Sequence, residues 1–280
     1  MRAIVVEPDG EPRLRDVPEP EGAGDLVEVR ACGLCGSDVE KLGPEAAGLV
    51  LGHEVVATRD GRLVALVHHL PCGECARCRA GHESTCERFR AATIEPGGLA
   101  ERVRAAASVD LPDGIGEAFG TYAEPLACVL RAAERVPRGE VALVGGGFVG
   151  RLFREVLSAR GDTAYVHDLD PSRDGPRAPG PVPAVVLCAP GGAAAAVELA
   201  EPGGTVVVFA SGGPLDLDDV YRRELTVVGT RSATPRHMED AVRLLPKLDL
   251  PGPTVLPLEL FAEGLELYRS RRALKVVFTP

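Results

Sequence analysis

Aromatic residues are scarce in this chain of 280 residues, which has seven phenylalanines, four tyrosines and no tryptophan. Large ligand pockets are lined mainly by hydrophobic and aromatic side chains. With so few rings in the whole chain, a large aromatic-lined pocket is hard to build. The composition therefore disfavours a protein that binds bulky aromatic ligands.

Long hydrophobic runs are also missing. Val206–Ala210 is among the longest, whereas a helix that crosses a bilayer needs about 20 apolar residues. The amino terminus leads directly into a predicted strand, Ala3–Val6, and shows no signal-peptide cleavage region. We therefore expect a soluble, cytoplasmic protein with no membrane partner, in a compartment that keeps thiols reduced.

An excess of positive charge is absent as well. The chain has 31 Lys and Arg residues against 41 Asp and Glu residues, a net charge of −10, and no basic stripe. Proteins that bind nucleic acids carry such a stripe, so we expect no nucleic-acid partner. Apolar residues make up 45% of the chain, which argues against disorder, and the length allows two domains.

The most informative feature is a run of four cysteines, Cys72-x2-Cys75-x2-Cys78-x7-Cys86. Zinc takes four thiolates in a tetrahedron, and two-residue gaps let one loop supply several ligands. Disulfides, free core thiols and an iron–sulfur site are the alternatives, but this spacing is a recognised zinc type. The segment has no apolar face, so metal ligation would supply its folding energy. Since four protein ligands leave no open position, this zinc should be structural.

A second group of metal-binding residue types lies upstream. Seventeen residues lie between Cys35 and the pair formed by His53 and Glu54. Cys35 and His53 suit a catalytic zinc, which keeps one position open and acts as a Lewis acid on an alcohol or carbonyl oxygen. Glu54 or a more distant carboxylate would complete the set. Ser37 is close enough to take a proton from an alcohol substrate, although a Ser-Asp pair alone is usually a helix cap.

A glycine cluster predicts a nucleotide site. Gly145-x-Gly147-x-x-Gly150 follows the apolar run Val141–Val144 and opens the helical stretch Phe148–Arg160. In such a turn small residues let the backbone approach a pyrophosphate, which rests on the helix amino terminus. Asp168 lies eighteen residues past Gly150, where a carboxylate accepts ribose hydroxyls and favours NAD over NADP. The alternative is an ordinary buried turn with an exposed Asp.

The predicted secondary structure changes character near Glu124. Before it, short β-rich runs broken by turn residues predict a small antiparallel barrel. After it, strands that alternate with helices predict parallel βαβ units. The segment 170–183, rich in Pro, Gly, Asp and Arg, is expected to be a tight surface connection in place of a helix and a strand. The expected strands are Ala3–Val6, Leu26–Ala31, Glu54–Thr58, Leu63–Val67, Val141–Val144, Ala164–Val166, Ala184–Leu187, Thr205–Phe209, Leu225–Val228 and Leu274–Phe278, and the expected helices are Leu126–Val136, Phe148–Arg160 and Met238–Leu245.

These motifs, in this order, resemble the zinc-dependent medium-chain dehydrogenase/reductase superfamily, that of alcohol, sorbitol, threonine and glucose dehydrogenases. Gly97–Glu101, Tyr122–Leu126 and Leu274–Val277 add to the resemblance, which covers nearly the whole chain. It implies an α/β fold of two domains. One is a β-rich, barrel-like (GroES-like) catalytic domain at residues 1–123 and 234–280 that carries a structural zinc lobe. The other is a Rossmann domain with a doubly wound parallel sheet at residues 124–233.

The resemblance also implies one structural and one catalytic zinc. The catalytic ion would be held by Cys35, His53 and either Glu54 or Glu124, which stands where alcohol dehydrogenases have a second cysteine. Glu40 replaces a histidine that in many relatives passes the proton to solvent. The glucose dehydrogenase branch is similar in this respect, which favours a sugar or polyol.

For the dinucleotide, the resemblance implies a set of binding residues and a preference for NAD. NADP is the alternative, because an arginine near Asp168 can offset the carboxylate. A homo-oligomer, either a dimer or a tetramer, is expected. The implied cofactor-binding residues are Gly145, Gly147, Phe148, Val149, Gly150, Asp168, Arg173, Arg231 and Lys275.

The predicted function is an oxidoreductase that transfers a hydride between a secondary alcohol and NAD, with a polyol, cyclitol or sugar as the small-molecule substrate. Two alternatives stay open, an NADP-preferring sugar dehydrogenase and a non-catalytic zinc- and nucleotide-binding sensor. The chain is shorter than most relatives. We expect its short segment between Cys35 and His53 to reshape the substrate pocket, and its short connection after Asp168 to alter the adenine pocket.

Overall fold

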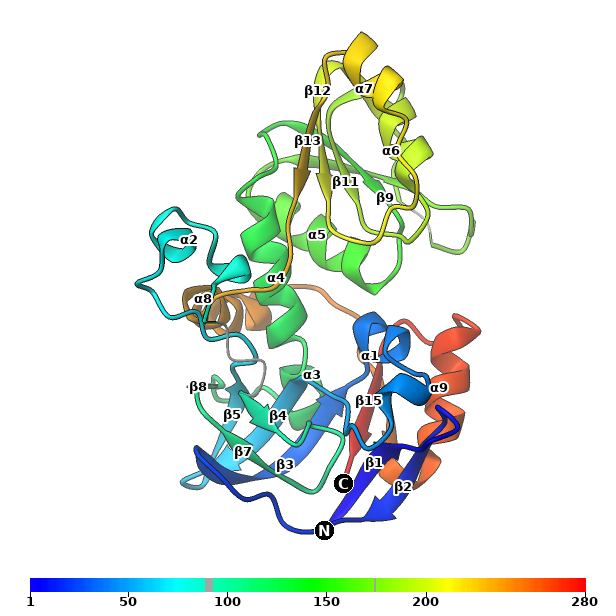
Figure 1. The fold of residues 1–280 in the computed structure, drawn as a ribbon. Helices are drawn as coiled ribbons and strands as arrows, with labels where there is room; N and C mark the ends of the chain where they lie inside the picture. The colour runs from blue at the N-terminus through cyan, green and yellow to red at the C-terminus, as the bar shows by residue number, and fades with distance from the viewer. Residues whose placement is uncertain (89–92, 174) are drawn as a thin grey trace. The chain divides into compact units, whose positions relative to one another are not determined.

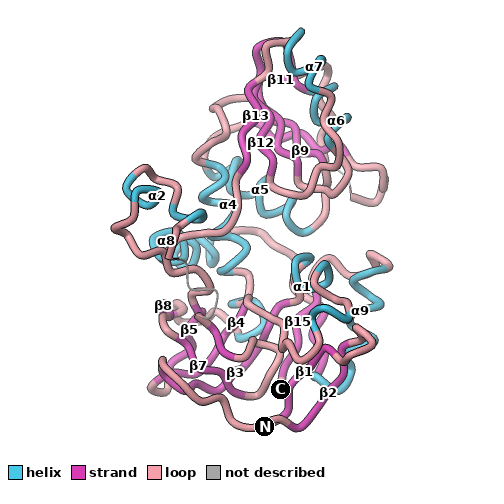
Figure 2. The backbone as a smooth tube through the Cα atoms, viewed as in Figure 1, coloured by secondary structure: helices cyan, strands magenta, loops and turns pink. Residues whose placement is uncertain are grey.

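The computed structural model describes residues 1–88, 93–173 and 175–280. The chain forms two compact units. The first unit comprises Met1–Ala127, Ala233–Lys247 and Pro251–Pro280, and the second comprises Cys128–Ser232 with Leu248–Leu250. Figures 1 and 2 trace the helices and strands of both units.

The first unit is built on a sheet with the strand order β14-β15-β3-β4-β5-β8, and β7, itself paired with β6, also pairs with β3. A separate hairpin joins β1 and β2. One pair differs from the expected antiparallel pattern, because β14 runs parallel to β15. The strands are β1 (Arg2–Val6), β2 (Pro12–Asp16), β3 (Asp25–Gly33), β4 (Glu54–Arg59), β5 (Arg62–Leu66), β6 (Ile94–Glu95), β7 (Arg102–Ala105), β8 (Ser108–Asp110), β14 (Thr254–Pro257) and β15 (Val276–Thr279).

Short helices accompany this sheet, with α3 packed on β3 and β4, α8 on β8 and α9 on β15. Helix α8 begins three residues before the predicted Met238, because Pro235 fits the first helical position, where no N–H is needed. The α-helices are α1 (Gly36–Glu40), α2 (Ala76–Arg79), α3 (Glu117–Gly120), α8 (Pro235–Leu244) and α9 (Phe261–Arg269), and 3₁₀ turns lie at η1 (Pro44–Ala46), η2 (Glu83–Thr85), η3 (Leu245–Lys247) and η4 (Leu258–Leu260).

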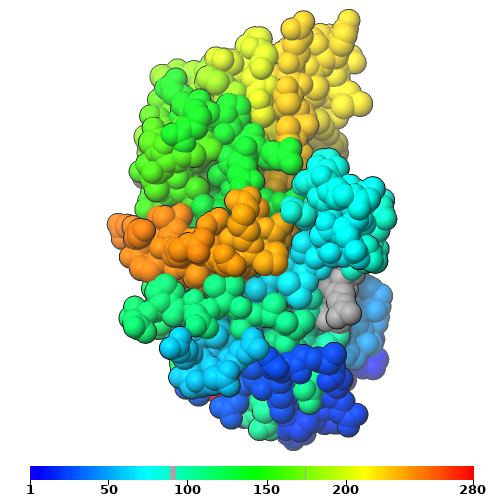
Figure 3. Space-filling model, turned by 90° about the vertical axis from the view of Figure 1, so that its left-hand side faces the viewer, coloured from blue at the N-terminus to red at the C-terminus, as the bar shows by residue number. Residues whose placement is uncertain are grey.

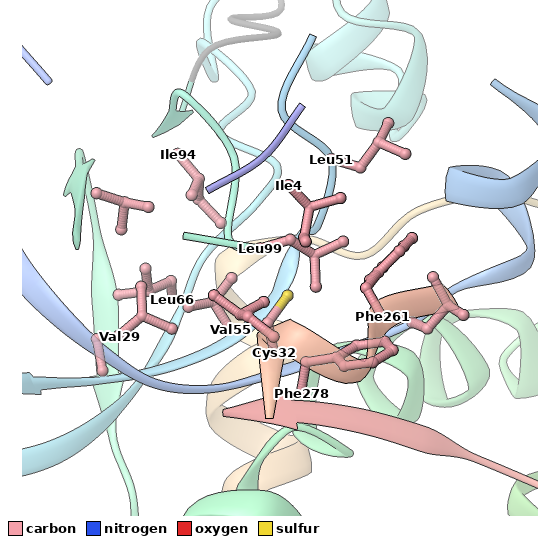
Figure 4. Packing of buried hydrophobic residues seen from close by; sticks show 14 of the residues in the cluster. Ile4, Val29, Cys32, Leu51, Val55, Leu66, Ile94, Leu99, Phe261 and Phe278 are labelled. Carbon is pink, nitrogen blue, oxygen red and sulfur yellow. The ribbon is translucent and has the colours of Figure 1, made fainter. Parts of the chain in front are cut away.

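Alternating burial explains how the strands of the first unit pack. In β3, Val27 and Val29 are buried while Glu28 and Arg30 are exposed, so the strand presents one apolar face. That face joins a core to which distant segments contribute, from Ile4 to Phe278. Figure 4 shows rings of α9 and β15 packed against the aliphatic side chains of the sheet. This core fixes the strand ends on which the candidate site is built.

The second unit holds a five-stranded parallel sheet with the order β10-β9-β11-β12-β13. Four consecutive residues of β9 are buried, as is usual for a parallel strand covered on both faces. Helix α5 buries Leu152, Phe153, Val156 and Leu157 on one side. The elements are β9 (Glu140–Val144), α5 (Phe148–Ala159), β10 (Thr163–His167), β11 (Val182–Leu187), α6 (Ala193–Leu199), β12 (Ala200–Val208), α7 (Leu217–Arg222) and β13 (Thr226–Gly229).

The connection between β10 and β11 is short. Its described residues, 168–173 and 175–181, contain no helix and no strand, which confirms the prediction for this part of the chain. A six-stranded Rossmann sheet would continue beyond β10, whereas here β10 is the edge strand. Val166 donates a hydrogen bond to the Pro176 carbonyl at 2.8 Å, so the connection lies against that edge.

Helix α4 (Ala123–Ala133) begins in the first unit and ends in the second. It starts and ends three residues earlier than the predicted Leu126–Val136. In the described part of the chain, no helix has both the length and the apolar character needed to cross a bilayer.

Candidate functional site

Strand register brings Cys35, His53 and Glu54 together. In the antiparallel pair β3–β4, Gly33 lies opposite Glu54, so residues just after β3 meet residues just before β4. Cys35 precedes α1, and His53 precedes β4. One ligand atom from each of these three residues lies within 4.8 Å of the other two. The predicted catalytic set is thus gathered in one place.

A buried carboxylate orients His53. Oδ1 of Asp38, in α1, lies 3.2 Å from Nδ1 of His53. Asp38 also accepts hydrogen bonds from the backbone N–H groups of Cys35, at 3.1 Å, and Gly52, at 3.3 Å. Burial would lower the pKa of His53, but the charges of Asp38 and Cys35 outweigh it and raise the pKa. Because Nδ1 faces Asp38, Nε2 is the ring nitrogen left for a metal.

Glu54 forms an ion pair with Lys275, and both side chains are almost fully buried. Nζ of Lys275 also donates to the Leu34 carbonyl at 3.1 Å. Burial would lower the pKa of Lys275, but the charges of Glu54 and Cys35 raise it. Gly33 leaves room for this pair, since a Cβ there would overlap the Glu54 carboxylate and displace it. The pair therefore places a charged carboxylate beside Cys35 and His53.

The donor set suits a catalytic zinc. A thiolate, an imidazole and a carboxylate are three zinc ligands, and three protein ligands leave a fourth position for substrate or water. The contact between Asp38 and His53 is the arrangement that metal-ligating histidines commonly show. Glu124, the other predicted carboxylate, does not belong to the cluster formed by the described residues Cys35, His53 and Glu54.

Ser37 and Glu40 both lie on α1. The Ser37 hydroxyl donates to Sγ of Cys35 at 3.4 Å, so it stands beside the first ligand of the set. Glu40 is exposed at the end of the helix. Their order leads from the metal ligands towards solvent.

A recess of the first unit adjoins this set. It encloses about 190 Å³ with its open mouth included. Val67, Ala233 and Met238 form its apolar part, and polar side chains that include His68, Glu124 and Thr234 complete the wall. The ring of His68 lies 4.8 Å from the ring of His53, centroid to centroid. Burial lowers the pKa of His68 to about 3, and the charge of His53 adds to this effect.

The four cysteines of the predicted structural zinc lobe, residues 72–86, converge as predicted. The Sγ atoms of Cys72 and Cys78 are 3.9 Å apart and those of Cys75 and Cys86 are 4.0 Å apart. Ligands of a tetrahedral zinc–thiolate site are separated by about 3.8 Å, given zinc–sulfur bonds of about 2.3 Å. All four thiols are free of disulfides. The spacing fits a structural zinc ion.

Backbone N–H groups support thiolates in the lobe. The amides of Cys75 and Cys78 point at the preceding sulfurs, those of Cys72 and Cys75, each at 3.4 Å. N–H groups of Glu87 and Cys78 lower the pKa of Cys75 to about 6, while burial raises the pKa of Cys78 to about 12. The only buried cluster of the lobe consists of its own cysteines, among the residues that the structure describes. Figures 1 and 3 show the lobe (cyan) beside α8 (orange).

In the second unit, the glycine turn lies between β9 and α5. Gly145 has φ 108°, a left-handed conformation that favours glycine. A Cβ at Gly150 would overlap the Gly145 carbonyl. Gly147 caps α5, and Phe148 and Val149 begin it. The turn therefore offers the backbone approach and helix amino terminus that a pyrophosphate needs.

Asp168 and Arg173 flank this turn. The Asp168 carboxylate accepts hydrogen bonds from the N–H groups of Gly146, at 2.7 Å, and Asp170, at 2.8 Å. Arg173 lies 3.9 Å from the Asp168 carboxylate, and its Nη1 would be 3.3 Å from a Cβ at Gly147. The short connection thus brings a cation back over the start of α5.

Two predicted cofactor residues lie elsewhere. Lys275 pairs with Glu54 in the first unit. The exposed Arg231 follows β13, and its carbonyl accepts a hydrogen bond from Arg131 at 2.7 Å.

No role was predicted from the sequence for two residues that lie at the site, Asp38 and His68. Asp38 could have been identified from the sequence, because it lies within the Cys35–Asp38 motif. His68 could not, because its proximity to His53 depends on tertiary packing.

Residues 23–113 match the family described as "Alcohol dehydrogenase GroES-like domain". The L-galactonate-5-dehydrogenase of Escherichia coli K12 is 27% identical over 322 aligned positions that cover 95% of each chain. A sorbitol dehydrogenase of Halalkalibacterium halodurans is 25% identical, with coverage of 100% of this chain and 99% of the relative. The chain belongs to the zinc-dependent medium-chain dehydrogenase/reductase superfamily.

A solved structure of the superfamily agrees with the fold. A protein described as a zinc-binding dehydrogenase, from Sinorhizobium meliloti 1021 and bound to NADP, superposes with a TM-score of 0.81 at 27% identity, over 100% of this chain and 99% of that one. The chain is accordingly an NAD(P)-dependent dehydrogenase of the zinc type. The alignment with the E. coli relative is longer than the 280 residues present here, so that relative has segments that this chain lacks.

Proposed function

We propose that this dehydrogenase transfers a hydride between NAD and a secondary alcohol of a polyol, cyclitol or sugar. The convergence of Cys35, His53 and Glu54 within 4.8 Å carries the proposal. A protein that only senses nucleotides has no need of three such ligands with Ser37 beside them. The set therefore favours catalysis over the non-catalytic alternative.

Cys35, His53 and Glu54 would hold the catalytic zinc. A zinc ion there supplies Lewis acidity towards the oxygen of an alcohol or carbonyl. Asp38 keeps Nε2 of His53 directed at the metal position through its contact with Nδ1. Lys275 balances the charge that Glu54 brings into a buried site. The four cysteines of the lobe would hold the second, structural zinc.

Ser37 would handle the proton of the reaction. Its hydroxyl, 3.4 Å from Sγ of Cys35, is close enough to the metal ligands to accept a hydrogen bond from a substrate hydroxyl. A hydroxyl can accept one proton while it donates its own. Glu40, exposed three residues further along α1, can receive the proton and exchange it with solvent.

A hydroxyl-rich substrate has two lines of support. The two relatives compared above are named as dehydrogenases of L-galactonate and sorbitol. The recess beside His53 has polar groups and, among the lining residues that the structure describes, no Phe, Tyr or Trp. Such a wall suits hydroxyl groups better than an aromatic ring. We therefore place polyols, cyclitols and sugars ahead of ethanol and aromatic alcohols.

NAD is the proposed dinucleotide because Asp168 follows β10, where a carboxylate repels an adenosine 2′-phosphate. NADP is the second candidate. Arg173 favours it, since its guanidinium lies near both Asp168 and Gly147. The solved structure from S. meliloti is bound to NADP.

The test compares Cys35→Ser with the wild-type protein and with Cys188→Ser, a cysteine outside both ligand sets. Wild type should contain close to two zinc equivalents and oxidise a polyol with NAD. Cys35→Ser should retain the fold and about one zinc and lose at least about 100-fold in kcat. Cys188→Ser should keep both zinc ions and its activity. Full turnover by Cys35→Ser would refute the assignment.

A further inference from the structure

The recess next to His53 contains a histidine that the metal set does not use. His68 follows β5 directly after Val67, and it is not part of the cluster Cys35, His53 and Glu54. Its ring lies 4.8 Å from that of His53. A group bound in the recess would therefore lie next to any substrate atom held at the metal.

The backbone around His68 is fixed on two sides. The N–H of Val67 donates to the Ala107 carbonyl at 2.9 Å, and the hydroxyl of Thr93 donates to the carbonyl of His68. These bonds fix the Cα position of His68, and the contact with the His53 ring limits where the His68 ring can lie. Binding groups held in this way lose little conformational entropy when a ligand arrives.

The wall of the recess combines two kinds of surface. Val67 and Met238 supply apolar atoms, and His68 and Thr234 supply polar ones. A polyol suits this wall, because its carbon atoms can contact the apolar side chains while its hydroxyl groups contact the polar ones. The ring nitrogens of His68 can donate to a hydroxyl or accept from it. A monohydroxy alcohol would leave those nitrogens facing hydrocarbon, which disfavours its binding.

We infer that His68 is a substrate-binding residue that recognises a hydroxyl group next to the reacting carbinol, and so makes the enzyme select vicinal polyols over monohydroxy alcohols. This inference rests on the proposed function, since it assumes that the substrate reacts at the Cys35, His53 and Glu54 set. It narrows the substrate class to alcohols with a second hydroxyl on the adjacent carbon.

The test replaces His68 with Phe, which keeps a ring beside His53 and removes both ring nitrogens. The matched control is His82→Phe, the same change at an exposed histidine of the lobe. Each protein is assayed with sorbitol and with 2-propanol, and zinc is measured in each. Sorbitol binding to zinc-loaded protein saturated with NADH is measured by calorimetry, which gives a readout without turnover.

His68→Phe should lower kcat/KM for sorbitol by 10- to 100-fold, mainly through KM, and change the value for 2-propanol by less than about threefold. Sorbitol affinity in the NADH complex should fall by a similar factor. His68→Asn, which keeps hydrogen-bonding groups, should recover part of the loss. His82→Phe should match the wild type with both substrates, and zinc should stay near two equivalents in every variant.

Three results would overturn the inference. A parallel loss with sorbitol and 2-propanol would indicate a general structural role, and a loss of zinc would make His68 part of the metal site. An unchanged ratio of the two substrates and unchanged sorbitol binding would show that His68 does not read a second hydroxyl. If wild type oxidises sorbitol and the ratio is unchanged, this inference alone fails. If wild type neither oxidises nor binds sorbitol, the proposed substrate class fails with it.

Discussion

The carboxylate of Asp38 contacts His53 and lies outside the set formed by the described residues Cys35, His53 and Glu54. It holds Nδ1 of the ring at 3.2 Å and is itself held by two backbone N–H groups. We expect Asp38→Asn to weaken zinc binding at the catalytic set by about 10- to 100-fold, because outer partners of this kind fix ring orientation and raise ligand basicity. Chelator competition measures the affinity.

The control for Asp38→Asn is Asp110→Asn, since Asp110 is exposed in β8, where it forms an ion pair with Arg62. The zinc of the cysteine lobe should remain bound in both variants. An unchanged affinity of the catalytic zinc in Asp38→Asn would show that the contact with His53 is incidental.

The position of Arg173 beside Asp168 leads to a prediction about nucleotide choice. Removing its guanidinium by Arg173→Ala leaves Asp168 without its nearby cation, so a 2′-phosphate would meet the carboxylate unscreened. We expect the Kd for NADP to rise about tenfold more than the Kd for NAD, measured by calorimetric titration. Arg177→Ala, an exposed arginine of the same connection, serves as the control and should leave both values near wild type. Equal losses for the two nucleotides would assign Arg173 to a part of the dinucleotide that both share.

Among the structural elements, the cysteine lobe depends most directly on metal. Its buried cluster consists of Cys75, Cys78 and Cys86 with Cys72 packed against them, so no apolar core remains once zinc leaves. Arg77 and Arg79 have exposed side chains on a folded backbone, and we expect chelation, or Cys75→Ser, to unfold that backbone and let trypsin cleave after them. Mass spectrometry should locate the first cuts within residues 72–88. First cuts in β3 or β4 instead would mean that the whole unit unfolds with the lobe.

The turn between α5 and β10 contains a carboxylate whose charge stabilises the second unit. Burial would raise the pKa of Asp162, but the N–H of Gly139 and the guanidinium of Arg160 outweigh it and lower the pKa. The folded state therefore favours the charged form, and this stabilisation is complete above the unfolded pKa of about 3.9. It is lost as the pH falls through the lower, folded pKa.

Asp162→Asn should accordingly reduce the free energy of unfolding by about 1–3 kcal/mol at pH 7. The difference from wild type should shrink below about pH 4, because both proteins then lack the charge. Urea unfolding at several pH values measures it. Asp60→Asn, in the exposed turn between β4 and β5, should stay close to wild type at every pH. A difference for Asp162→Asn that stays constant with pH would point to a cause other than charge.

Elements with a strong local pattern could be predicted from the sequence. The buried run of β9, the apolar side of α5 and the four spaced cysteines each carry their signal within about fifteen residues. Short elements with weak patterns, such as α6 and α7, could not be predicted in this way. The predicted helix began at Met238, whereas α8 begins at Pro235, because a proline fits the first helical position.

At the scale of the whole molecule, contacts between distant segments escaped prediction. The pair Glu54–Lys275 joins residues 221 positions apart through the register of β3, β4 and β15. The position of Arg173 over Gly147 depends on how a shortened connection folds back. Such contacts arise from packing, which residue patterns do not encode locally. The oligomeric state likewise stays a prediction.

The shortened connection also bears on aggregation. It leaves β10 as an edge strand of a parallel sheet, and exposed edges invite a strand of another molecule to pair with them. The connection that meets this edge at Pro176 also contains Pro179 and Pro181. Pro176 accepts a hydrogen bond from Val166, yet proline has no N–H with which to extend a ladder. Where the connection meets β10, its prolines therefore offer few N–H groups with which a strand of another molecule could pair.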